Sequence, residues 1–126
     1  MRYLLRILPA VLIAVSVTAT LAAAETKAVQ TMAGILLKLN HFPGDAEKTA
    51  LQGVIDDKAT TKDERTVAQA LLNVQHTIKD ADKEKLEALT KDKDASESVK
   101  TLATVLLSLK HTPSDTDKEK LKKLAS

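Results

Sequence analysis

The segment TVAQALLNVQHTIKDADKEKLEAL at residues 66–89 decides the fold, because it is repeated on both sides of itself at a spacing of 35 residues. Its later copy is TLATVLLSLKHTPSDTDKEKLKKL at 101–124, and its earlier copy is TMAGILLKLNHFPGDAEKTALQGV at 31–54. No gap is needed to align the three. A fixed period of this length is typical of a helical-repeat protein. We therefore predict a single domain over residues 25–126, with units at about 26–60, 61–95 and 96–126.

Each unit is predicted to be a helical hairpin. Residues of N-cap type, Thr26, Thr61 and Ser96, mark the start of a strongly apolar first helix, which we expect to be contacted on several sides and to end near an aligned histidine. A second helix is predicted to start around Asp45, Asp80 or Asp115. Its apolar residues form only a narrow stripe, so we expect it to lie on the outside of the domain.

The fold class is therefore all-α, with three tandem hairpins. The period and the helix–turn–helix unit resemble tetratricopeptide repeats in shape. The Trp, Gly, Tyr, Phe and Pro positions that characterise that family are not filled in this chain. Two architectures stay open at this point, a tetratricopeptide-like stacked array and a compact six-helix bundle.

The first 24 residues have the pattern of a secretory signal peptide. Arg2 and Arg6 precede an apolar stretch, and Ala22-Ala23-Ala24 forms a small-residue cleavage site before Glu25. We expect cleavage, which predicts a periplasmic or secreted protein without stable membrane insertion. The alternative is an uncleaved anchor, for which the apolar stretch is short and interrupted.

Composition excludes several classes of function. Without Arg2 and Arg6, the 19 basic residues become 17, equal to the 17 acidic residues, so the remaining chain is electrically balanced. With Phe42 as its only aromatic residue, this part is not expected to bind nucleic acid. The chain contains no Cys and no catalytic motif of a familiar kind, so we predict that it is not an enzyme and needs no cofactor.

The aligned histidines His41, His76 and His111 are the strongest candidate site residues. Imidazole is a common metal and haem ligand, and this predicts an alternative function in metal or haem binding. The competing interpretation is that each histidine caps the end of a helix. Equivalent positions on packed neighbouring helices lie about 8–10 Å apart, so we expect two histidines at most to share an ion.

The leading functional prediction from the sequence is a non-enzymatic protein-interaction module. Stacked hairpins commonly present an extended binding surface, and the partner is predicted to be another exported or envelope protein. Phe42 is the candidate partner-binding residue, because it is the one aromatic side chain available to anchor a contact.

Overall fold

The computed structural model describes residues 25–126, and the predicted signal peptide at 1–24 lies outside the described residues. All regular secondary structure in the described part is helical, as predicted. The six helices are α1 (Lys27–Lys38), α2 (Asp45–Asp56), α3 (Lys62–Leu72), α4 (Asp80–Lys91), α5 (Glu97–Leu107) and α6 (Asp115–Ala125). None of these helices is long and apolar enough to cross a membrane.

The predicted start of each first helix is confirmed by its cap. The hydroxyls of Thr26, Thr61 and Ser96 accept hydrogen bonds from the backbone N–H groups three residues further on. Thr61 and Glu64 form a reciprocal capping box, in which the Glu64 carboxylate accepts a hydrogen bond from the Thr61 N–H. Each cap satisfies a backbone donor that the helix itself leaves unpaired, so the three starting points are fixed locally.

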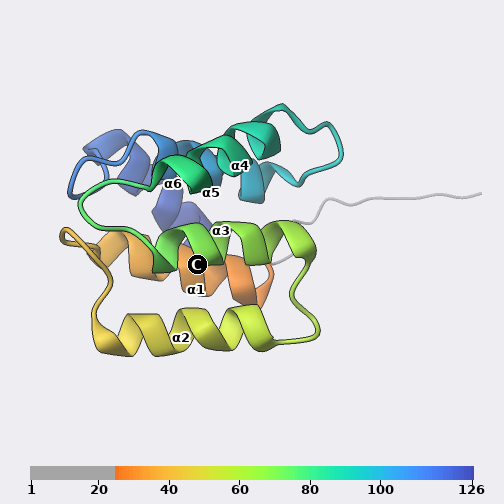
Figure 1. Cartoon of the computed structure of the whole chain (residues 1–126), viewed down its shortest axis with the longest axis horizontal. Helices are drawn as coiled ribbons and strands as arrows, with labels where there is room; N and C mark the ends of the chain where they lie inside the picture. Colours follow the sequence, from red (N-terminus) through yellow and green to blue (C-terminus); the bar gives the residue numbers. More distant parts are fainter. Residues whose placement is uncertain (1–24) are drawn as a thin grey trace, which may run out of the picture.

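The hairpins close into a ring. Helices α1, α3 and α5 contact one another at the centre, and α2, α4 and α6 lie around them. Each outer helix packs mainly against the inner helix of the next unit: α2 against α3, α4 against α5, and α6 against α1 (Figure 1). The last contact joins the last helix to the first helix of the described part. The structure is therefore a compact six-helix bundle, and the open stacked array is not formed.

The core follows the repeat. The inner helices contribute most of it, with sets of equivalent residues that are fully buried, whereas each outer helix buries only one or two apolar side chains. The equivalent residues with no exposed surface are Ala33, Ala68 and Ala103; Leu36, Leu71 and Leu106; and Leu51, Leu86 and Leu121. This pattern confirms that the first helix of each unit is central and the second is outward.

The loops that follow α1, α3 and α5 meet at one end of the bundle, at the left in Figure 1. Their apolar residues Leu39, Val74 and Leu109 are buried in the core at this end of the bundle and anchor the loops to it. The three inner helices therefore point the same way, and their carboxyl ends face the three loops. This arrangement positions the aligned histidines.

The architecture predicts a large effect of truncating a central leucine. Leu71→Ala should lower the free energy of unfolding by about 2–5 kcal/mol, because Leu71 is fully buried and the shorter side chain leaves a cavity. Gln69→Ala is the matched control, since Gln69 is exposed on the same helix and its loss should change stability by less than about 0.5 kcal/mol. Urea denaturation measures both, and equal midpoints for the two variants would contradict the packing described above.

Candidate functional site

The three histidines occupy identical backbone positions in loops beyond the inner helices. The helices end at Lys38, Leu72 and Leu107, so each histidine follows three or four residues later and is not part of the helix. Their φ angles are positive, at 72° for His41, 71° for His76 and 67° for His111. These are the only non-glycine residues with positive φ in the part of the chain that the structure describes.

Each histidine is the central residue of a tight turn. The N–H of the residue after it donates to the carbonyl of the residue before it, at 2.9 Å for Phe42 to Asn40, 2.8 Å for Thr77 to Gln75 and 2.7 Å for Thr112 to Lys110. An i to i+2 hydrogen bond around a residue with positive φ defines the rarer, strained form of the γ-turn. Glycine adopts positive φ more readily than histidine does, because it has no Cβ atom.

The backbones of the three turns are joined in a closed cycle. The His41 N–H donates to the His111 carbonyl at 2.9 Å, the His111 N–H donates to the His76 carbonyl at 2.8 Å, and the His76 N–H donates to the His41 carbonyl at 2.6 Å. The backbone of each histidine thus donates one hydrogen bond to a second unit and accepts one from the third. The cycle fixes the three turns relative to one another and compensates for the strain of the positive φ angles.

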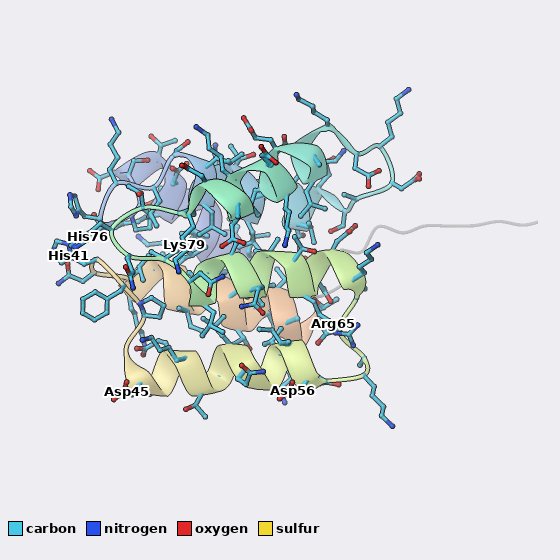
Figure 2. The ribbon with its side chains drawn as sticks, in the orientation of Figure 1. His41, Asp45, Asp56, Arg65, His76 and Lys79 are labelled. Atoms are coloured by element: carbon cyan, nitrogen blue, oxygen red, sulfur yellow. The ribbon has the colours of Figure 1, made fainter. Side chains whose placement is uncertain are left out.

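The side chains converge on one point. The Nδ1 atoms of His41 and His76 are 3.1 Å apart, those of His41 and His111 are 2.9 Å apart, and those of His76 and His111 are 3.1 Å apart. The ring planes meet edge to face at 68° to 76°. Figure 2 shows His41 and His76 together at the end of the bundle. His76 and His111 are exposed and His41 is half-buried, so the triangle of nitrogens is accessible from solvent.

Two expectations about the histidines were therefore wrong. They do not cap helix ends, because their Nδ1 atoms face one another and the turns lie beyond the last helical residues. They are also not separated by the spacing of neighbouring helices. That spacing applies to a row of units, whereas a closed ring brings equivalent loops to a common axis.

Three neutral imidazoles do not satisfy this geometry by themselves. Each Nδ1 atom carries either one proton or one lone pair in the ring plane. A single proton pairs well with one acceptor, and lone pairs that face one another at about 3 Å repel. A cation at the point of convergence pairs with all three lone pairs at once, so the triangle has the form of a three-nitrogen metal site.

The dimensions agree with a tetrahedral ion. Zinc–nitrogen bonds of 2.0–2.1 Å at tetrahedral angles place the nitrogens about 3.3 Å apart. The observed separations of 2.9–3.1 Å require the rings to move outward by only a few tenths of an ångström. Three histidines fill three positions of such an ion and leave the fourth open toward solvent.

Phe42, the predicted partner-binding residue, lies beside this site. Its side chain is 55% exposed, and it lines an open pocket of about 420 Å³ together with His76. Lys48 and Lys79 also line this pocket, and the sequence analysis did not single them out. A signal for Lys79 was present, since this position is Gly44 in the first unit and Ser114 in the third.

Comparison with known proteins gives no assignment. No family model, no curated protein and no solved structure matches the chain.

The strain at the histidines has a measurable consequence. In the presence of a chelator, His76→Gly should be about 1 kcal/mol more stable to urea than His76→Ala, because only glycine adopts this φ angle without steric cost. The same pair of substitutions at the exposed helical residue Gln69 should give the opposite order, with glycine about 1 kcal/mol less stable than alanine. The same order at both positions would show that the turn is not strained.

Proposed function

We propose that the protein binds a divalent transition-metal ion, zinc in the first place, through the Nδ1 atoms of His41, His76 and His111. The observation that carries this proposal is the triangle of nitrogens, in which all three separations lie between 2.9 and 3.1 Å. The strained backbone at the three histidines also supports the proposal. Glycine would be easier to accommodate at these positions, and backbone strain of this kind concentrates at functional sites.

The donor set determines which ions fit. Imidazole nitrogen suits zinc, copper, nickel and iron, whereas calcium and magnesium prefer oxygen ligands. Three nitrogens on one side of an ion form a pyramid with it, and a tetrahedral Zn²⁺ accepts this arrangement. Cu²⁺ prefers a square plane, which these three nitrogens do not form. The carboxyl ends of the three inner helices face the same loops, and the helix dipoles add a small attraction for a cation.

The haem alternative fits this geometry less well. A haem iron takes its axial ligands along the normal to a flat macrocycle. The three imidazoles instead lie around one point, with their Nδ1 atoms about 3 Å from one another. A compact ion occupies that point without displacing any of the rings. The three histidines therefore suit a metal ion better than a haem.

The interaction module and the exported location stay predictions. Stacked hairpins that present an extended surface were the reason to expect a protein partner, and the described helices close into a ring instead of an open stack. The exposed Phe42 supports a contact of some kind at the histidine end of the bundle. Export depends on residues 1–24 alone, and it would place the metal site in the periplasm or outside the cell.

Metal binding is tested by titrating metal-free protein with Zn²⁺ in a calorimeter. We expect one ion per chain, and replacing all three histidines with Gln should abolish the binding. His41→Gln alone should weaken binding by at least about 100-fold, because loss of a direct ligand costs no less than loss of an outer-shell partner. A matched control, Asp56→Asn with Asp57→Asn, removes exposed carboxylates and should leave the affinity unchanged.

The same ion should stabilise the fold. At a free Zn²⁺ concentration 100 times the dissociation constant, the free energy of unfolding should rise by about 2.7 kcal/mol, because the ion binds the folded chain and joins all three units. Thermal unfolding with and without Zn²⁺ measures this effect. Unchanged zinc affinity in the triple Gln variant would overturn the proposed function.

A further inference from the structure

The three units differ most informatively beside the metal site. Where the second and third units have Thr77 and Thr112, the first unit has Phe42. Where the first and third have Gly44 and Ser114, the second has Lys79. In a protein built from copies of one unit, most equivalent positions serve the shared fold. Phe42 and Lys79 are two of the residues that differ between units, and both line the same pocket, between the turn of the first unit and the loop of the second.

The pocket has the charge of an anion site. Lys48 and Lys79 both line it, both are exposed, and no acidic side chain is among its lining residues. Within residues 25–126, neither lysine forms an ion pair with a carboxylate. Figure 2 shows Lys79 near the histidine end of the bundle. Two ammonium groups without a protein partner attract a negatively charged ligand.

The pocket also has an apolar wall and a volume suited to an organic molecule. Phe42, Leu72 and Val74 provide this wall, and the volume of about 420 Å³ falls in the range of small-molecule sites. Asn73 and Gln75 add neutral hydrogen-bonding groups. An inorganic anion would use the lysines but leave the exposed ring of Phe42 without a contact. An organic anion uses both.

The pocket adjoins the proposed metal site. His76 is a member of the nitrogen triangle and also lines the pocket. Three histidine ligands leave the fourth position of a tetrahedral ion open to an exogenous ligand. A carboxylate oxygen is a good ligand for zinc at about 2.0–2.2 Å, so an anion in a pocket lined by His76 is a candidate for the open position.

We propose that the protein binds a small organic carboxylate in the pocket between Phe42 and Lys79, with one carboxylate oxygen as the fourth ligand of the metal held by the three histidines. The apolar body of the ligand packs against Phe42 and Leu72, and the negative charge is paired with Lys48 and Lys79. This inference rests on the proposed metal site, and it adds the class of molecule that the site takes up.

The test uses Co²⁺ in place of Zn²⁺, because the visible spectrum of Co²⁺ responds to a change of ligand. Co²⁺ is first titrated into the metal-free protein, and benzoate is then added to the loaded protein. We expect benzoate to change the spectrum with saturation, and the neutral analogue benzamide to leave it unchanged. Phe42→Thr and Lys79→Ser, which install the residues found in other units, should each weaken benzoate binding at least about fivefold.

The controls separate the two proposals. Both variants should bind Co²⁺ within about twofold of the original protein, since neither residue is a metal ligand. Lys83→Ser changes the residue equivalent to Lys48 in the second unit, and it should leave benzoate binding unchanged. Failure of the original protein to bind Co²⁺ would overturn the metal site and this inference together. Normal Co²⁺ binding without a benzoate response, or equal benzoate affinity in all variants, would overturn this inference alone.

Discussion

Each outer helix covers the inner helix of the following unit, and the rest of the structure depends on this displaced packing. Because an outer helix has only a narrow apolar stripe, it is suited to cover one neighbour and to face water on its other sides. No preceding unit supplies an outer helix to cover the first inner helix, α1, and α6 covers it instead. When α6 packs against α1, the array closes and no terminal unit remains exposed.

Closure places three equivalent loops around one axis, which a stacked array of the same units would not do. In a row, each histidine would have neighbours on different sides, and the two outermost would be far apart. In the ring, each histidine neighbours the other two, and the backbone hydrogen bonds run in a cycle. The convergence of three Nδ1 atoms follows from this arrangement together with the positive φ angles that turn each side chain toward the axis.

The residues that the three units share and the residues in which they differ have different roles in this structure. The shared residues build the core and the triangle of histidines, and they give the bundle its three-fold character. Phe42 and Lys79, which each occur in one unit only, break this symmetry beside one histidine.

The sequence by itself determined the helices, their caps and the division into inner and outer layers. These features depend on local hydrogen bonds and on apolar spacing, as at Thr61 with Glu64 and at Leu86 with Leu89. It also identified His41, His76 and His111 as a set. Only the tertiary structure decided that they meet, because ring closure depends on the contact between α6 and α1, which lie at opposite ends of the chain. The positive φ of each histidine was not predicted from its local sequence, and the hydrogen bonds that join the three turns come from other units.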